Sequence, residues 1–237
     1  MPAIRIVRTV AGVAAAGLGI ASAAYAGLVA SAWFTYGRPG EPGAGEQDEL
    51  LDRFMPAYDV VERHRIFIDA PAATVVEAAK AQNLMQLPLV RAIFKAREVA
   101  LGAASDHPLP PNGLLATVQS LGWVVLAERP GREIVVGAVT RPWEANVTFR
   151  ALPPEQFAAY DEPGNVKIVW TLRAKPVGEQ RCVFLTETRA VATDATARRR
   201  FRAYWAFASP GISTIRWLSL MPLKREAERR ARTPAAA

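Results

Sequence analysis

The sequence contains very few of the residues that build metal and redox sites. It holds one cysteine, Cys182, and two histidines, His64 and His107. A single cysteine excludes an internal disulfide, and a structural zinc site needs four Cys or His ligands. We therefore predict no metal and no cofactor. Cys182 is expected to be a small buried apolar residue.

Signatures of common catalytic sites are missing as well. The chain has no serine-hydrolase elbow, no phosphate-cradling glycine loop and no pair of metal ligands. Neither histidine has a carboxylate or a nucleophile at a spacing that indicates a dyad, so both are expected to be ordinary surface residues. No catalytic residue is predicted. This favours a non-enzymatic role and leaves an enzyme open.

The charge balance is basic. The chain has 29 Lys and Arg against 22 Asp and Glu, which gives a net charge of +7. Such a balance fits nucleic acid, an anionic membrane surface or a basic soluble face. Because no zinc-ligand set, RNP-like aromatic motif or helix-turn-helix pattern accompanies it, nucleic-acid binding is not predicted.

The longest uncharged stretch runs from Thr9 to Gly37 and is dominated by small apolar residues. About 20 such residues span a bilayer. Arg5 and Arg8 precede the stretch, and acidic residues follow it, so the positive-inside rule places the N-terminus in the cytoplasm. We predict a single-pass helix in the cell inner membrane, with the domain on its outer, periplasmic side.

A cleaved signal peptide is the main alternative, with Ala24-Tyr25-Ala26 as the cleavage site and a secreted or periplasmic product. The apolar character continues beyond this site to Phe34, where a mature N-terminus would turn polar. This continuation favours an uncleaved anchor, with Trp33, Phe34 and Tyr36 as its interfacial aromatic belt. A buried core helix is a third interpretation.

Patterns of apolar residues and breakers divide the remaining chain. Residues 38–48 are rich in Gly, Pro and acidic side chains and predict a linker, which a lead-in helix over 49–58 follows. Period-two patterns predict strands and period-3.6 patterns predict helices. The expected strands are 60–68, 123–128, 133–139, 146–150, 166–172 and 180–191, and the expected helices are 71–81, 87–101 and 153–159, with a proline-rich loop over 106–113.

The C-terminal stretch predicts one long helix from Asp194, the expected N-cap, to Arg232. Phe201, Trp205, Ala208, Ile212 and Ile215 recur at helical spacing, so they form one apolar face that needs a hydrophobic partner. The pair Ser209-Pro210 is expected to interrupt the helix.

Three stretches carry a resemblance to a known superfamily: Arg65 to Val76, Gly122 to Trp143, and Thr186 to Gly211. Together with the order of elements they resemble the helix-grip fold of the START-like superfamily, also called SRPBCC, over residues 58–231. The resemblance implies an α+β fold in which a curved antiparallel sheet wraps a long C-terminal helix. The resulting division is 1–8 cytoplasmic, 9–37 transmembrane, 38–57 linker and lead-in, 58–232 START-like domain and 233–237 disordered tail.

This fold implies a function because a curved sheet on a helix leaves an apolar gap suited to a hydrophobic molecule. The first hypothesis is a non-enzymatic, membrane-tethered domain that binds a hydrophobic small molecule or lipid. The alternatives are a cyclase or dehydratase-type enzyme in the same cavity, and an envelope interaction module without ligand. The candidate cavity residues are Trp143, Trp170, Phe184, Thr186, Glu187, Arg189, Tyr204 and Trp205. Alternation along the last strand leaves open which of its faces lines the cavity.

Overall fold

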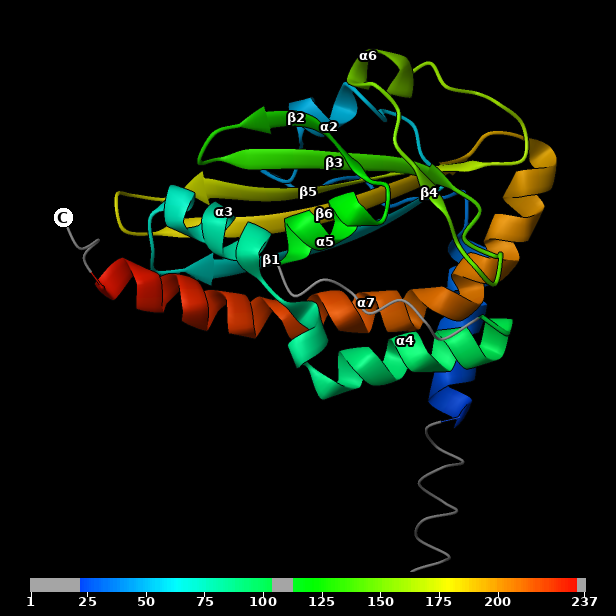
Figure 1. The fold of residues 1–237 in the computed structure, drawn as a ribbon, viewed down its shortest axis with the longest axis horizontal. Helices are drawn as coiled ribbons and strands as arrows, with labels where there is room; N and C mark the ends of the chain where they lie inside the picture. Colours follow the sequence, from blue (N-terminus) through cyan, green and yellow to red (C-terminus); the bar gives the residue numbers. More distant parts are fainter. Residues whose placement is uncertain (1–21, 104–112, 234–237) are drawn as a thin grey trace, which may run out of the picture.

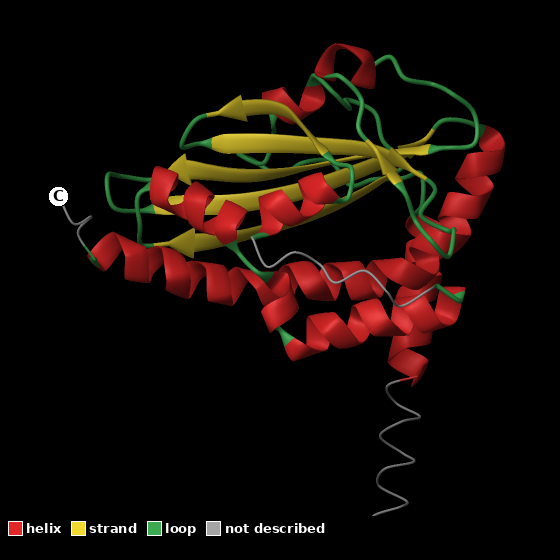
Figure 2. Ribbon diagram, in the orientation of Figure 1, coloured by secondary structure: helices red, strands yellow, loops and turns green. Residues whose placement is uncertain are grey.

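The protein is described here by a computed structural model that covers residues 22–103 and 113–233. Within these residues, six strands form one antiparallel sheet with the order β1-β6-β5-β3-β2, and β4 pairs with the end of β3 (Figures 1 and 2). The strands are β1 (Val60–Ile68), β2 (Val124–Arg129), β3 (Glu133–Thr140), β4 (Phe149–Arg150), β5 (Val166–Pro176) and β6 (Cys182–Ala192).

Helices cover both faces of the sheet. Besides a helix at residues 22–35, the elements are α2 (Glu49–Asp52), α3 (Ala72–Ala81), the 3-10 turn η1 (Leu84–Gln86), α4 (Pro88–Leu101), α5 (Leu114–Ser120), α6 (Pro154–Phe157) and α7 (Ala195–Arg232). Helices α3, α5 and α7 lie on one face of the sheet, and α2 and α6 lie towards the other (Figure 1). Side chains alternate between the two faces along each strand.

The first face carries the larger apolar core. Ile66, Trp170 and Phe184 point from β1, β5 and β6 into a cluster that includes Leu220 and Leu223 of α7. Helix α3 contributes to the same cluster with five buried residues, from Ala72 to Ala79. This is the layer in which the sheet holds the C-terminal helix.

The second face is covered by the segment that the sequence predicts to be a linker and a lead-in helix. Leu51 and Met55 are buried against Val135 and Val169 of the sheet. Asp48 is buried and caps α2, its carboxylate accepting a hydrogen bond from the Leu51 amide. Leu51 and Met55 belong to the predicted lead-in segment, of which Glu49–Asp52 form α2, while the end of the predicted linker is held against the sheet at Asp48. We call residues 38–58 the strap.

Helix α7 begins where the sequence predicts, with the Asp194 carboxylate accepting hydrogen bonds from the Thr196 and Ala197 amides. It continues through Pro210 and Pro222, so the interruption expected at Ser209-Pro210 is a kink and not a new helix start. The first part of α7 stands at one end of the sheet, and the rest runs along the sheet (Figure 1). A proline kink is the ordinary cause of such a bend.

The helix at residues 22–35 packs against the first part of α7. The Tyr25 hydroxyl donates to the Phe207 carbonyl at 2.6 Å. Tyr36 stacks edge-on against Phe201 at 5.8 Å, and the Arg202 guanidinium lies 4.3 Å from the Trp33 ring centroid. Trp33 and Tyr36, expected in an interfacial belt, thus have protein partners.

None of the helices in the described ranges is long and apolar enough to cross a bilayer. Residues 9–21 of the predicted transmembrane segment lie outside those ranges, as do residues 106–112 of the proline-rich loop and residues 234–237 of the expected tail.

Most predicted elements are found, with small shifts at their ends. β1 has the predicted bounds, and α3, α4, the β2–β3 hairpin, β5, β6 and α7 agree to within a few residues. Pro71 is the N-cap of α3 and not its first residue. Helix α5 was not predicted.

Trp205 offers a test of the contact between α7 and the sheet. It is 8% exposed and packs with Phe201, Val60 and Val166. We expect Trp205→Ala to lower the free energy of unfolding by about 3 to 5 kcal/mol in chemical denaturation. Trp217, on the same helix and 66% exposed, is the matched control, and Trp217→Ala should change stability by less than about 0.5 kcal/mol. Equal effects of the two substitutions would contradict this packing.

Candidate ligand-binding site between the sheet and α7

The apolar layer between the sheet and α7 is broken in its middle by polar side chains. Along β1, Glu62 and His64 lie between Val60 of one apolar cluster and Ile66 of the other. Along β6, Thr186 and Thr188 separate Phe184 from Ala190 in the same way. On α7, Arg216 lies between Ile212 and Leu220. Cross-strand pairing sets His64 opposite Thr186 and Glu62 opposite Thr188, so the polar residues form one patch.

Arg216 is the cation of this patch. Its Nη1 donates to Thr186 Oγ1 at 2.8 Å, and this is its one hydrogen bond to a residue in the described ranges. No carboxylate of the described residues pairs with it, since Glu62 pairs with His64. Desolvation lowers the pKa of Arg216 to about 10, against the opposing effect of the Glu62 charge. A guanidinium has five N–H donors, so most of its hydrogen-bonding capacity is unused here.

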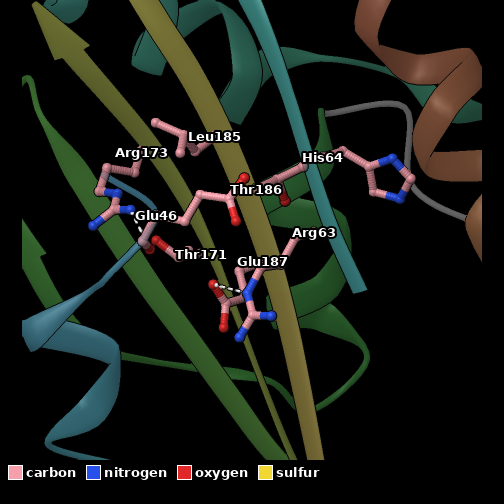
Figure 3. Close-up of a pocket in the computed structure, with 8 residues that line it drawn as sticks. All are labelled: Glu46, Arg63, His64, Thr171, Arg173, Leu185, Thr186 and Glu187. Atoms are coloured by element: carbon pink, nitrogen blue, oxygen red, sulfur yellow. Dashed lines mark hydrogen bonds and ion pairs between the residues drawn. The ribbon is translucent and has the colours of Figure 1, made fainter. Parts of the chain in front are cut away.

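His64 and Glu62 form a pair on β1. Their Nε2 and Oε2 atoms are 3.4 Å apart, and both side chains are largely covered. His64 Nε2 and Thr188 Oγ1 are buried without a hydrogen-bond partner in the described structure. Figure 3 shows the His64 ring on the opposite side of β1 from Arg63 and Glu187, towards the helices. Buried polar atoms without hydrogen-bond partners are uncommon, so these atoms mark the patch as a candidate site.

Six of the eight predicted cavity residues lie on the α7 side but belong to two separate clusters. Trp170 and Phe184 are in the cluster around Leu220, and Thr186 lies at its edge, bonded to Arg216. The other three are in the cluster around Phe201: Trp143, Tyr204 and Trp205. The polar patch is what lies between the two groups.

Glu187 and Arg189 are on the opposite face, which corrects their placement in this cavity. Arg189 is 2% exposed, and its guanidinium contacts Glu187 Oε1 at 2.6 Å and Asp52 Oδ1 at 2.5 Å. It also donates to the Met55 carbonyl and lies 4.6 Å from the Tyr58 ring centroid. The even-numbered residues of β6 face α7, so the odd-numbered ones face the strap. This pair therefore holds the second half of the strap to the sheet.

The strap covers its face closely. The cavity enclosed there measures about 10 Å³, room for about one water molecule. Figure 3 shows its lining, with Arg63 Nε 3.1 Å from Glu187 Oε2 and Arg173 donating to the Glu46 carbonyl at 2.9 Å. The other of the two best-formed pockets among the described residues is an open groove of about 570 Å³ beside the β2–β3 and β5–β6 turns. Neither is the expected cavity between sheet and α7.

A second ionisable group is enclosed under the strap. Glu133 is 1% exposed beside Asp48, Arg173 and Arg129. Desolvation, together with a hydrogen bond and charge repulsion from Asp48, raises the pKa of Glu133 to about 8. Arg173 lies 3.3 Å from Asp48 and donates to the Gln47 carbonyl at 2.8 Å. The two acids and Arg173 tie the strap to β3 and β5.

The sequence contains a signal for the polar patch, although four of its residues are absent from the predicted cavity lining: Glu62, His64, Thr188 and Arg216. His64 does have a carboxylate nearby, at Glu62, because residues two apart on a strand share a face. Arg216 follows Ile212 by four residues and precedes Leu220 by four, so it interrupts the apolar stripe of α7 at helical spacing. Both positions break an apolar pattern on its buried side, and such a break marks a candidate site.

The arrangement of elements decides the fold. One antiparallel sheet with β1 and β2 at its edges is followed by a long C-terminal helix that lies along one face, with α3 and α4 inserted after the first strand. The chain has the helix-grip fold of the START-like superfamily. The α+β class and the resemblance expected from the sequence are thereby confirmed at the level of the fold.

Comparisons with known proteins add no argument to this assignment. A scan against family models and a search of curated proteins gave no match. Similar solved structures include a hypothetical protein from Helicobacter pylori at 7% identity, covering 76% of this chain and 94% of that one, with a TM-score of 0.35. A norcoclaurine synthase from Thalictrum flavum matches at 11% identity, with 72% and 94% coverage and a TM-score of 0.28. An aromatase/cyclase from Streptomyces matches at 17% identity, with 75% and 98% coverage and a TM-score of 0.23.

Glu133 predicts a pH dependence of stability. Its pKa is raised from 4.5 in the unfolded chain to about 8 in the folded chain, so between these values the folded state retains a proton that the unfolded state has lost. The free energy of unfolding should therefore fall as pH rises from about 5 to about 8 and then level off. Glu133→Gln, which stays neutral, should remove this part of the fall in denaturation curves measured at pH 5 and pH 9. An unchanged slope in the variant would show that Glu133 is ionised in the folded protein.

Proposed function

We propose that this protein binds a hydrophobic small molecule with an anionic head group between the sheet and α7, without chemical conversion. The observation that carries the proposal is Arg216, a cation set between two apolar clusters with a single neutral hydrogen-bond partner among the described residues. Glu62 acts on Arg216 through its charge but forms its ion pair with His64, so an anionic ligand would supply the direct counter-charge that this partly covered cation lacks among the described residues.

The neighbouring atoms suit the same head group. Thr186 Oγ1 accepts from Arg216 and still has a hydroxyl proton to donate. On the same patch, Thr188 Oγ1 has no hydrogen-bond partner within the described structure, and His64 Nε2 lies 3.4 Å from Glu62 Oε2. The apolar side chains of the two clusters, with Phe184 on one side of the patch and Trp205 on the other, would contact the apolar part of the ligand.

Binding requires the polar patch to open, because neither of the two best-formed pockets among the described residues lies at this point. Pro210 and Gly211 lie shortly before Arg216 in α7, and Pro210 has no amide proton for the helical hydrogen bond. We infer that the part of α7 after this point moves away from β1 and β6 to admit the ligand.

The N-terminal region is the second part of the proposal. The helix at residues 22–35 carries no charge and is almost entirely exposed, including Leu28 and Phe34 at 55% and 70%. Residues 9–21 before it are also uncharged. We propose that this region anchors the domain in the inner membrane, with the N-terminus in the cytoplasm and the domain outside.

An enzyme of the cyclase or dehydratase kind is the second candidate, and the Glu62–His64 pair favours it. A histidine oriented by a carboxylate is a common general acid or base. Mass spectrometry of an extract from the purified chain separates the two functions. A compound that is recovered unchanged from the original protein and from His64→Gln supports binding, whereas a mass change that His64→Gln abolishes supports catalysis.

A fluorescent fatty acid tests the role of Arg216. A dansyl-labelled undecanoic acid should bind the purified chain, and Arg216→Leu should weaken this binding about 10- to 100-fold, since a charge-assisted hydrogen bond contributes about 1.5 to 3 kcal/mol. The methyl ester of the same compound should bind the original protein and the variant almost equally, because it brings no charge. Fluorescence titration measures all four affinities.

Arg225→Leu is the matched control, because Arg225 is exposed on the same helix. It should leave both affinities unchanged. Equal loss of acid and ester on Arg216→Leu, or no binding of either by the original protein, would contradict the proposal.

A further inference from the structure

Helix α4 has an outward face that the rest of the described structure leaves uncovered. Its inner side is fixed: Val90 is fully buried, Ile93 lies against Gly211 of α7, and Arg97 donates to the Pro142 carbonyl at 3.2 Å. On the outer side, Leu89 and Val99 are 52% and 72% exposed. Ala92, Ala96 and Ala100 are exposed on the same side.

Basic side chains accompany these apolar residues. Arg91 and Lys95 are exposed and lie one helical turn apart, and the one acid of the helix, Glu98, pairs with Lys95 at 3.2 Å. A helix with an apolar strip and basic neighbours suits the boundary between head groups and acyl chains of an anionic bilayer. A soluble protein partner is the alternative for such a surface, and the position of α4 decides between the two.

α4 lies on the side of the molecule from which the helix at residues 22–35 projects, and it runs across the direction of that helix (Figure 1). The helix at residues 22–35 packs on α7 through Tyr25 and Trp33 and is level with α4 in the same view. A bilayer that the chain enters at the N-terminal end of this helix therefore has α4 along its surface. The position of α4 and the character of its exposed side chains therefore both favour an anionic bilayer as the partner.

We propose that the outer face of α4 is a membrane-docking surface that rests on the anionic bilayer in which the chain is anchored. Leu89 and Val99 enter the acyl boundary, and Arg91 and Lys95 contact lipid phosphates. The inference rests on the proposed anchoring and goes beyond it, because an anchor alone would allow the domain to stand off the membrane on any side. Docking through α4 fixes the orientation of the domain and places the ligand site next to the lipid.

Site-specific fluorescence in the full chain tests this orientation. Cys182, the one native cysteine, is buried, so an introduced cysteine can be labelled selectively. Val99→Cys places a fluorophore on α4. Val177→Cys is the control, since Val177 is 56% exposed in the β5–β6 turn, at the far end of the sheet from the helix at 22–35 (Figure 1). Both proteins are reconstituted into vesicles of phosphatidylcholine and phosphatidylglycerol that contain lipid spin-labelled on the acyl chain.

The fluorophore at residue 99 should be quenched several-fold more strongly than the one at 177, and the difference should shrink in vesicles of phosphatidylcholine alone. Flotation of the vesicles is measured on the same samples. Flotation with equal, weak quenching at both positions would overturn docking and leave the anchor standing. Absence of flotation would overturn the anchor and the docking together. Equal quenching in the two lipid mixtures would show that the basic residues take no part, and would overturn the choice of an anionic surface.

Discussion

The buried ion pairs of Arg189 determine how this domain is layered. With Glu187 beside it on β6 and Asp52 on the strap, Arg189 closes a network that fastens the strap across the sheet. The sheet is consequently a middle layer with a covered face on each side. Replacing such a network by apolar residues can be neutral, but removing one member leaves a buried charge and costs several kcal/mol, about 3 to 5. Among the described residues, charge pairing therefore closes the second face, which leaves the α7 face for the proposed site.

On the α7 face, the informative feature is that polar side chains separate two apolar clusters. A helix packed on a sheet needs only apolar contacts to be stable, and the two clusters around Leu220 and Phe201 supply them. The polar patch between them weakens the interface at its centre. Proteins keep such a local conflict chiefly where function requires it. Arg216 is the clearest example, because a leucine there would continue the stripe from Ile212 to Leu220.

The sequence predicts the elements well and the layers less well. Alternation and helical spacing placed β1, the β2–β3 hairpin, β5, β6 and α7, since these long patterns are strong local signals. The contacts between the strap and the sheet are not predicted because they are long-range. Asp48 and Arg173 are far apart in the chain, and the Gly- and Pro-rich composition around Asp48 gives no sign of their ion pair. For the site, alternation leaves the facing of β6 open, because both of its faces are buried and each carries polar residues. In the structure Phe184 and Thr186 lie on the helix side, and Glu187 and Arg189 lie on the strap side.

The bend of α7 has a mechanical consequence. Before Pro210 the helix is clamped to residues 22–35 through Phe207 and Arg202, and after it the helix carries Arg216 against β6. The continuous helix α7 thus joins the N-terminal helix to the polar patch. Its bend at Pro210 lies between these two attachments. A change in the tilt of the N-terminal helix therefore reaches the contact between Arg216 and Thr186 through α7. Under the proposed function, the bilayer around the anchor and the opening of the ligand site are coupled through this one helix.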